Sequence, residues 1–265
     1  MDDTINLPPG VLSGDIVSWG SSAVVAQLTD KTVIKCPFGG EASRSQMETE
    51  KRIYERLTKQ DSHNCILRYY GSSEYGIILG YACNGTLRGF MKMERSKEQP
   101  LPDRLRWSRQ LAESLRFVHS KGVLHGDICC NNVFLDENLD LRLGDFGGSS
   151  IDGRPAVLCY EASHRHPDIS LKGNISLKSE FFALGSTIYE IMTGSAPYAQ
   201  ASSKSIKDFY ARGVFPKLDH LDAFTVIIAK CWGGCYNSMD EVMKDIEAEG
   251  MYSHSIHSMT EIDSL

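Results

Sequence analysis

The stretch HGDICCNNVFLDENLDLRLGDFGG, residues 125–148, guides the interpretation of the whole chain. Two short apolar runs, NVFL and LRLG, flank the turn-prone DENLD, and this pattern predicts a β-hairpin. A hairpin centred between Asn138 and Leu139 places Asn132 directly opposite Asp145, and a centre one residue earlier fits the turn equally well. Opposed residues of an antiparallel pair have Cα atoms ~4.5–5.5 Å apart, so the first register brings an amide and a carboxylate together.

Oxygen-bearing side chains dominate the ends of this hairpin. An amide oxygen from Asn132 and a carboxylate from Asp145 are hard ligands of the kind that Mg²⁺ prefers. Asp127, in the loop that enters the first strand, could lie at the edge of the same site and accept a proton from a hydroxyl during phosphate transfer. A hairpin with polar ends and solvated acids explains the same spacing, and the stretch alone does not choose between the two.

Composition places the chain among ordinary globular proteins. Its 265 residues suffice for one large domain or two lobes, and 42% hydrophobic and 23% charged residues exclude disordered and fibrous classes. A net charge of −6 gives no electrostatic basis for binding nucleic acid or an anionic membrane. No apolar run approaches the ~18–20 residues that cross a bilayer, and MDDTINLPPG lacks the apolar core of a secretory signal. We therefore expect an intracellular monomer, cytoplasmic or nuclear, with neither membrane nor nucleic acid as partner.

The eight cysteines do not form a recognisable framework. Cys231 and Cys235 are one helical turn apart, but no second pair or histidine follows at metal-ligand spacing, which favours ordinary thiols. Adjacent Cys129 and Cys130 lie beside the acidic stretch and allow a redox hypothesis. No cation near them in the sequence would lower a thiol pKa, so this hypothesis is the weaker one.

Secondary-structure patterns divide the chain into a mostly β first third and a mostly α remainder. Strand-like runs occupy residues 11–40, and a helix from Glu41 to Lys59 follows, with Met47, Glu50, Ile53, Tyr54 and Leu57 on one face. After two further strands the pattern becomes helical, including EFFALGSTIYEIMTG, which is apolar nearly all round. We expect an α+β fold with an N-terminal extension (1–10), an N-lobe (11–82), a C-lobe (83–249) and a flexible tail (250–265).

Motifs outside the opening stretch favour the catalytic interpretation. Lys35 ends an early strand, and Glu50 on the inward face of the next helix could pair with it. HGD and DFG follow in order with Asn132 between them, and RHPD, SEFFALGSTIYEIMTGSAPY and KCW come further on. This ordered set, from Val11 to Glu249, resembles the eukaryotic-type protein kinase superfamily, and in detail the short kinase-like proteins of filamentous fungi. The resemblance implies a two-lobed kinase fold: an antiparallel β N-lobe with one helix and a mainly α C-lobe.

The resemblance also implies roles for particular residues. Lys35 would hold the ATP phosphates and Glu50 would orient it, Asp127 would be the catalytic base, and Asn132 and Asp145 would hold Mg²⁺, which Mn²⁺ could replace. The remaining nucleotide contacts would come from Ser18, Gly20, Ala23, Val25 and Val33 around the phosphates and adenine, from Leu79 as the gatekeeper, and from Gly80, Tyr81 and Ala82 as the hinge. A hydrophobic spine through both lobes would contain His125, Phe146, Tyr54 and Tyr69, although plain core packing also accounts for Tyr54, Tyr69, Val25 and Leu79.

Several positions depart from the family pattern. The nucleotide loop SWGSSAVV keeps only the middle glycine, Gly20, which should weaken ATP binding without abolishing it. Cys129 and Asn131 stand where kinases place a lysine or arginine, and losing such a cation typically costs ~10²–10³ in rate. Gly126 replaces the arginine that reads a phosphorylated activation loop, and Glu180 replaces the usual aspartate, a change in reach but not in charge.

Three functions are compatible with these motifs. The first is a slow ATP-dependent protein kinase acting on serine or threonine hydroxyls of an unidentified protein. The second is a nucleotide-binding pseudokinase scaffold, which the missing cation and the altered glycine loop favour. The third is a small-molecule phosphotransferase, because HGD also resembles the antibiotic and choline kinase signature, although DFG and the ALGSTIYEIMTG helix oppose it.

Overall fold

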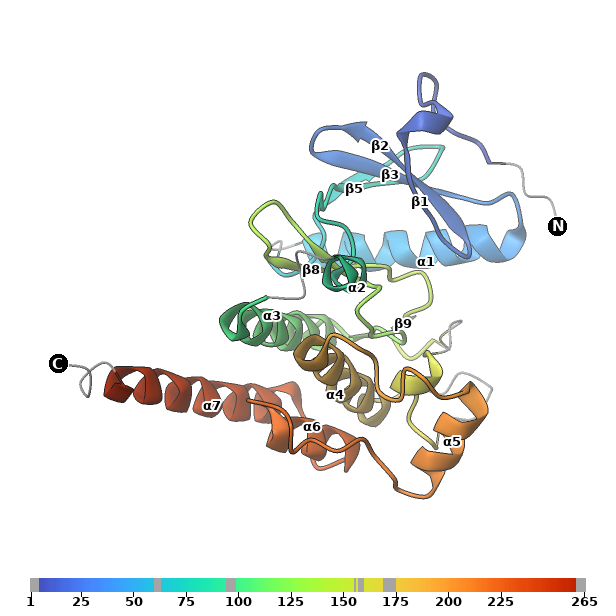
Figure 1. The fold of residues 1–265 in the computed structure, drawn as a ribbon. Coiled ribbons are helices and arrows are strands. Elements are labelled where there is room, and N and C mark those ends of the chain that lie inside the picture. The colour runs from blue at the N-terminus through green and yellow to red at the C-terminus, as the bar shows by residue number, and fades with distance from the viewer. Residues whose placement is uncertain are drawn as a thin grey trace.

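The chain forms two lobes, with a β-sheet and one helix above and a bundle of helices below (Figure 1). The structure is a computed structural model and describes residues 5–59, 63–93, 99–154, 156, 160–168 and 175–260, with side chains described up to Glu249. The prediction of a two-lobed α+β fold is confirmed.

The N-lobe sheet is antiparallel, with strand order β1-β2-β3-β5-β4. The elements of the N-lobe are η1 (Ser13–Asp15), β1 (Ile16–Trp19), β2 (Ala23–Thr29), β3 (Thr32–Pro37), α1 (Glu41–Thr58), β4 (Tyr69–Ser72) and β5 (Ile77–Gly80). The buried residues of α1 are Met47, Glu50, Ile53, Tyr54 and Leu57, the face predicted from the sequence. The opposite face of the sheet is covered by the start of the chain, where Ile5, Leu7 and Val11 pack on Val24, Ala26, Ile34 and Cys36.

The C-lobe is built around α4 (Leu177–Thr193), a helix buried on almost every side. The Ser176 side chain caps its start, and Gly194 ends it in the left-handed conformation with φ 74°. Around it lie α2 (Leu87–Lys92), α3 (Leu101–Ser120), β6 (Val123–Leu124), β7 (Val133–Leu135), β8 (Leu141–Leu143), β9 (Ser150–Ile151), η3 (Ala162–His164), α5 (Ser203–Ala211), α6 (Thr225–Trp232) and α7 (Met239–Thr260).

The β7–β8 hairpin forms, but in neither of the predicted registers. The backbone N–H of Gly144 donates to the carbonyl of Asn132 at 3.0 Å, so Asn132 lies opposite Gly144 rather than Asp145. The ladder pairs Val133 with Leu143, Phe134 with Arg142 and Leu135 with Leu141. The cause is the turn, in which Leu139 adopts the left-handed conformation with φ 59°, as in a three-residue hairpin loop. The Asp136 carboxylate fixes this turn by accepting the N–H groups of Asn138 and Asp140, each at 2.9 Å.

The last described residues of the chain, within the range predicted as a tail, are helical. Helix α7 continues through residues 250–260, where the sequence contains neither proline nor glycine after Gly250 to interrupt a helix. Residues 261–265, the rest of the predicted tail, lie outside the described residues. In the part of the chain that is described, no helix combines the length and apolar character needed to cross a membrane.

Candidate active site

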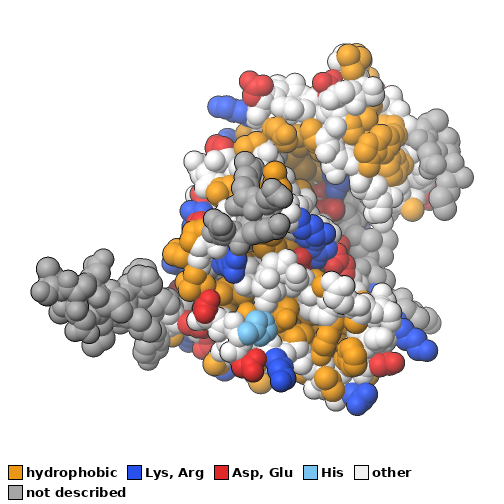
Figure 2. All heavy atoms as spheres, in the orientation of Figure 1, with side chains coloured by type: hydrophobic (Ala, Val, Ile, Leu, Met, Phe, Trp, Pro, Cys, Tyr) orange, Lys and Arg blue, Asp and Glu red, His pale blue; other side chains and the backbone are white. Residues whose placement is uncertain are grey.

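A cavity of about 570 Å³ lies between the lobes, under the β1–β2 turn and in front of the segment that joins β5 to α2. Figure 2 shows the hollow, with basic and acidic side chains inside it. The predicted residues that line it are Ser18, Gly20, Ala23, Val25, Val33, Lys35, Glu50, Leu79, Gly80, Tyr81, Ala82 and Asp145. Asp127 and Asn132 are not in this lining; they belong to the loop before β7, whose Asn131 does line the cavity.

The sequence interpretation missed other lining residues, namely Val17, Trp19, Leu67, Cys83, Gly85, Thr86, Asn131 and Phe134. Cys83 directly follows the predicted hinge, Gly85 and Thr86 come shortly after it, and all three could have been found by extending it. Leu67 and Phe134 come from different lobes, and only the fold brings them to one cavity.

The glycine-poor turn between β1 and β2 is a tight hairpin. The N–H of Gly20 donates to the carbonyl of Ala23 at 2.8 Å, and Ser21 and Ser22 form the tip. A Cβ on Gly20 would lie 3.2 Å from that carbonyl oxygen, which explains why this one glycine is needed for the closed turn.

Lys35 is the centre of the charged cluster in the cavity. Its Nζ lies 2.7 Å from Glu50 Oε2 and 2.7 Å from Asp145 Oδ1, so the predicted pairing with Glu50 is present and a second carboxylate joins it. Burial opposes the charged form of Lys35, but the two carboxylates outweigh it and raise the lysine pKa. The Lys35 charge in turn lowers the pKa of Asp145. The ammonium and the Asp145 carboxylate therefore remain charged at neutral pH.

Asn132 orients the predicted base. Its Nδ2 donates to the Asp127 carbonyl at 2.7 Å and to Asp127 Oδ2 at 2.9 Å, which leaves the amide oxygen for another partner. Asp145 immediately follows Gly144 and adopts the left-handed conformation with φ 60°, so the chain leaves the direction of strand β8 there. The Asp145 side chain is 40% exposed. Burial raises the pKa of Asp127, which makes it a better proton acceptor than an exposed aspartate.

The donor set fits a divalent cation held together with phosphate oxygens. Among the described residues, no group of three or more His, Cys, Asp or Glu side chains could hold a metal by itself. Mg²⁺ is commonly bound by only one or two protein oxygens plus substrate phosphates. The Asn132 amide oxygen and the Asp145 carboxylate meet that requirement.

Glu180, at the start of α4, holds the backbone that precedes Asp127. Its Oε2 accepts the N–H of His125 at 2.8 Å, and its Oε1 accepts the N–H of Gly126 at 2.9 Å. His119 and the Tyr160 hydroxyl also contact this carboxylate, which is fully buried. Burial alone would raise the pKa of Glu180, but these hydrogen bonds outweigh burial and lower it. Glu180, although longer than the aspartate that is usual at this position, therefore anchors the catalytic loop.

Aromatic rings connect the two lobes behind the cavity. Tyr69 stacks on Tyr54 with ring centroids 5.6 Å apart, and Tyr54 meets the edge of Phe146 at 5.2 Å. Phe146 lies 5.0 Å from the ring of His125, whose Nε2 is 2.9 Å from the Gly144 carbonyl. The four residues predicted as a spine therefore form one continuous stack from the sheet to the catalytic loop.

An ion cluster stands at the position where a catalytic cation is expected. Asn131 Nδ2 donates to Glu161 Oε1 at 3.2 Å, and Arg88 Nη1 donates to the same oxygen at 2.6 Å. Arg88 also binds Glu190, with Nε 2.5 Å from Oε1 and Nη2 2.8 Å from Oε2. Because two carboxylates share this guanidinium, it leaves no unpaired positive charge for a phosphate. No sequence pattern indicated a role for Arg88, because its partners lie 73 and 102 residues away.

The adjacent cysteines are enclosed rather than reactive. Cys129 is 2% exposed and Cys130 is fully buried, and burial raises the pKa of both thiols. Burial therefore disfavours the thiolate that redox chemistry requires, and the redox hypothesis loses its chemical basis.

Comparison with known proteins agrees with this geometry. A family model described as protein tyrosine and serine/threonine kinase matches residues 26–238. The inactive serine/threonine-protein kinase PLK5 of Mus musculus is 25% identical over 78% of this chain and 37% of its own length. The cell cycle serine/threonine-protein kinase CDC5/MSD2 of Saccharomyces cerevisiae is 24% identical over 69% and 26%, and human serine/threonine-protein kinase ULK1 is 23% identical over 75% and 21%. The chain thus spans well under half of the length of each of these relatives.

Proposed function

Because the chain belongs to the protein tyrosine and serine/threonine kinase family, we propose that it transfers the γ-phosphate of ATP to a serine or threonine hydroxyl of a protein substrate. The observation that carries the proposal is the charged cluster of the inter-lobe cavity. Lys35 contacts both Glu50 and Asp145 at 2.7 Å, and Asn132 orients Asp127.

The chain's own residues divide the chemistry between them. Lys35 would bind phosphate oxygens while Glu50 holds its ammonium group in the cavity. Asp127 would accept the proton of the substrate hydroxyl, and its raised pKa favours that step. Asn132 and Asp145 would hold Mg²⁺, which supplies positive charge to the phosphate oxygens when ATP is bound.

We propose that this enzyme is slow. Cys129 is buried and Asn131 is uncharged, and Arg88 behind Asn131 is neutralised by Glu161 and Glu190. Without a free cation at this position, developing charge on the transferred phosphate lacks one donor, and the rate should fall by ~10²–10³.

The pseudokinase scaffold is the second candidate. The same missing cation supports it, and one of the similar proteins is named an inactive kinase. The oriented Asp127 opposes it, because a protein that binds nucleotide without transferring phosphate has no need for a positioned base.

We also propose that the chain comprises an N-lobe of residues 11–82 and a C-lobe of residues 83–249, is a monomer, and acts in the cytoplasm or nucleus. Light scattering on the purified chain tests the monomer, for which the sequence gives a mass of 29.5 kDa.

Transfer of ³²P from ATP separates the candidate functions. The wild-type chain and an Asp127→Asn control receive Mg²⁺ or Mn²⁺ and three acceptor sets: the chain itself, a protein mixture, and a panel of aminoglycosides and amino alcohols. Labelled protein in the wild type alone supports the proposal, whereas label on small molecules supports a small-molecule phosphotransferase. Absence of all transfer, together with a melting temperature raised by Mg·ATP, supports the pseudokinase.

A further inference from the structure

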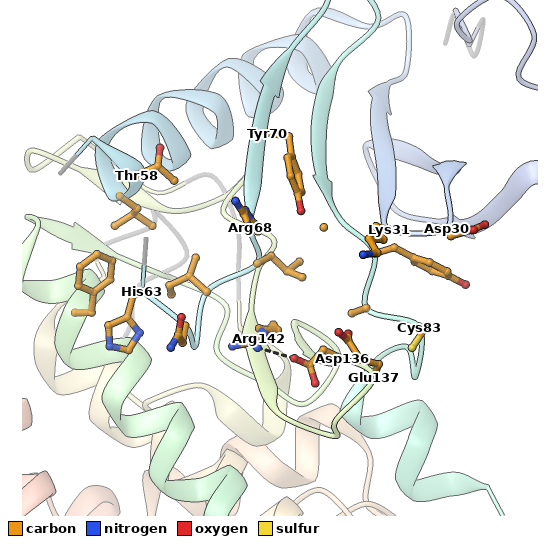
Figure 3. A pocket seen from close by; sticks show the side chains of 18 residues that line it. Asp30, Lys31, Thr58, His63, Arg68, Tyr70, Cys83, Asp136, Glu137 and Arg142 are labelled. Carbon is orange, nitrogen blue, oxygen red and sulfur yellow. Dashed lines mark hydrogen bonds and ion pairs between the residues drawn. The ribbon is translucent and has the colours of Figure 1, made fainter. Parts of the chain in front are cut away.

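A second cavity, of about 590 Å³, lies behind the hinge (Figure 3). The Lys and Arg side chains of its lining equal the Asp and Glu side chains in number, three of each: Lys31, Arg68, Arg142, Asp30, Asp136 and Glu137. Asp136 and Arg142 already pair with each other. The lining of this cavity therefore favours neither anions nor cations, whereas the buried contacts of Tyr160 are more specific.

Each carboxylate oxygen of Glu180 accepts one backbone N–H of the catalytic loop and meets one side-chain partner. Oε1 accepts the N–H of Gly126 at 2.9 Å and the hydroxyl of Tyr160. Oε2 accepts the N–H of His125 at 2.8 Å and lies 3.2 Å from His119 Nε2. Glu180 is fully buried and Tyr160 is 3% exposed, so water does not compete for these contacts. The carboxylate thus joins the Tyr160 hydroxyl to the backbone of the catalytic loop.

The length of the Glu180 side chain makes the additional partners important. A glutamate has one more rotatable bond than an aspartate, so more contacts are needed to hold its carboxylate in one orientation. Two backbone N–H groups supply part of this constraint, and the Tyr160 hydroxyl and His119 supply the rest. Hydrogen bonds to an ionised carboxylate are about twice as strong as those between neutral groups. Loss of the Tyr160 hydroxyl should therefore loosen the loop that Glu180 holds.

Gly126 has no side chain with which the catalytic loop could hold the neighbouring segment. Its φ is 80°, and a Cβ at this position would lie 3.3 Å from Ile175 Cδ1 and 3.5 Å from the Gly148 carbonyl oxygen. A larger residue would be strained there, because the left-handed conformation favours glycine. Contacts between the loop and the segment that follows β9 must therefore come from other residues, and Tyr160 lies in that segment, between β9 and η3.

The next residue of the same segment contacts the other end of the loop. Glu161 accepts a hydrogen bond from Asn131 Nδ2 at 3.2 Å, but the Glu161 side chain is 36% exposed. An exposed contact of this kind contributes little, whereas the contact between Tyr160 and Glu180 is buried. The segment thus contacts the loop on both sides of Asp127, and Tyr160 makes the stronger of the two contacts.

We propose that Tyr160 is a positioning residue for phosphate transfer, because through Glu180 it holds the loop that carries Asp127. The inference rests on the proposed kinase activity, in which Asp127 is the base. The contact needs no phosphate on the segment, since the unmodified hydroxyl itself donates the hydrogen bond. Tyr160 is not in the lining of the nucleotide cavity, so its effect should fall on transfer and not on ATP binding.

Tyr160→Phe and a matched control, Tyr210→Phe, separate this role from plain packing. Both tyrosines are 3% exposed, and the Tyr210 hydroxyl donates to the Ser163 carbonyl at 2.9 Å, a contact that does not involve the catalytic loop. Each variant keeps its ring, so both are expected to fold. In phosphatase-treated protein, the amides of His125 and Gly126 should exchange hydrogen about tenfold faster in Tyr160→Phe than in the wild type, and at the wild-type rate in Tyr210→Phe.

Steady-state transfer of phosphate gives a readout that packing alone would not change. In Tyr160→Phe, kcat should fall roughly 10- to 100-fold, because the base is no longer held in place. The KM for ATP and the calorimetric Kd for Mg·ATP should stay at their wild-type values, which assigns the loss to the transfer step. Tyr210→Phe should match the wild type in all three quantities.

Three results would overturn the inference. The first is equal exchange at His125 and Gly126 in Tyr160→Phe and the wild type, whether or not the chain transfers phosphate. The second is faster exchange with an unchanged kcat, and the third is a loss of Mg·ATP binding as large as the loss of kcat. Absence of transfer by the wild type would count against the proposed kinase activity instead, and faster exchange in Tyr160→Phe alone would then still support the contact that holds the loop.

Discussion

Replacing Arg88 with methionine should destabilise the folded chain more than any other single change of a surface or half-buried residue that we consider. Glu190 is 2% exposed, so removing its cation leaves a buried carboxylate, and such losses cost ~3–5 kcal/mol. Glu161 is 36% exposed and can recover hydration, so its share is below ~1 kcal/mol. Small domains have ~5–15 kcal/mol of total stability, and the expected loss is a large part of that.

The free energy of unfolding that Arg88→Met loses should become smaller as the pH falls. Burial alone would raise the pKa of Glu190, but hydrogen bonds from Arg88 and His164 outweigh burial and lower it to about 2. A lowered pKa gives stabilisation that is full above the unfolded value of ~4.3 and is lost as the pH falls toward the folded value. Without Arg88, burial raises the pKa of Glu190, so this variant takes up a proton at a higher pH than the wild type does, and the difference between wild type and Arg88→Met should shrink as the pH falls from 7 to 4.

Urea unfolding followed by circular dichroism measures this effect, with Arg88→Met, Glu190→Gln and the double variant compared at pH 7 and pH 4. The double variant should be more stable than Arg88→Met alone, because it no longer buries an unpaired charge. A loss below ~1 kcal/mol in Arg88→Met would refute the reasoning, since the pair would then behave like an exposed ion pair. A double variant as unstable as Arg88→Met would show that packing, and not charge, sets the cost.

Other expectations follow from the same contacts. Glu180→Ala should cost ~1–3 kcal/mol for each backbone N–H that it leaves unsatisfied, and a thermal melt that matches the wild type would contradict the anchoring role. Phe146→Ala should cost ~3–5 kcal/mol in urea unfolding, because it opens the aromatic stack in the core, and a loss under ~1 kcal/mol would argue against that packing. Cys129 and Cys130 should resist iodoacetamide in the native chain and react after unfolding, as peptide mass spectrometry would show; rapid native labelling would contradict their burial. Because burial raises the pKa of Asp127, the carboxylate form is lost as the pH falls, so transfer should decline at a pH above the ordinary aspartate value of ~4; a pH profile flat down to that value would contradict it.

The sequence alone was enough to propose the parts of the candidate site whose residue types are required by their chemistry. Lys35, Glu50, Asn132 and Asp145 could be chosen because a phosphate and a metal demand a cation, an orienting acid and hard oxygen ligands. The helix α4 could be predicted from its apolar composition and its glycine stop. Each of these features depends on the residue types within one short segment, which can be interpreted without knowing the fold.

The errors and omissions concern properties that only the folded chain defines. The hairpin register was wrong by one residue because Leu139 adopts a left-handed conformation, which a leucine does not signal. Arg88 was missed because its two acidic partners are distant in sequence, and the reach of Glu180 could not be judged without the loop that it holds. The cavity behind the hinge is lined by segments from both lobes, so no single stretch of sequence predicts it.

The central claim is that Asp127 accepts a substrate proton in a cleft where Lys35 and Asp145 bind Mg·ATP. A single-turnover measurement of ³²P transfer from ATP to protein, with wild type and Asp127→Asn at saturating Mg²⁺, addresses it most directly. The account predicts slow but measurable transfer by the wild type and no transfer by Asp127→Asn, with both proteins binding ATP equally. Equal transfer by the two proteins, or none by a wild type that binds Mg·ATP, would contradict it.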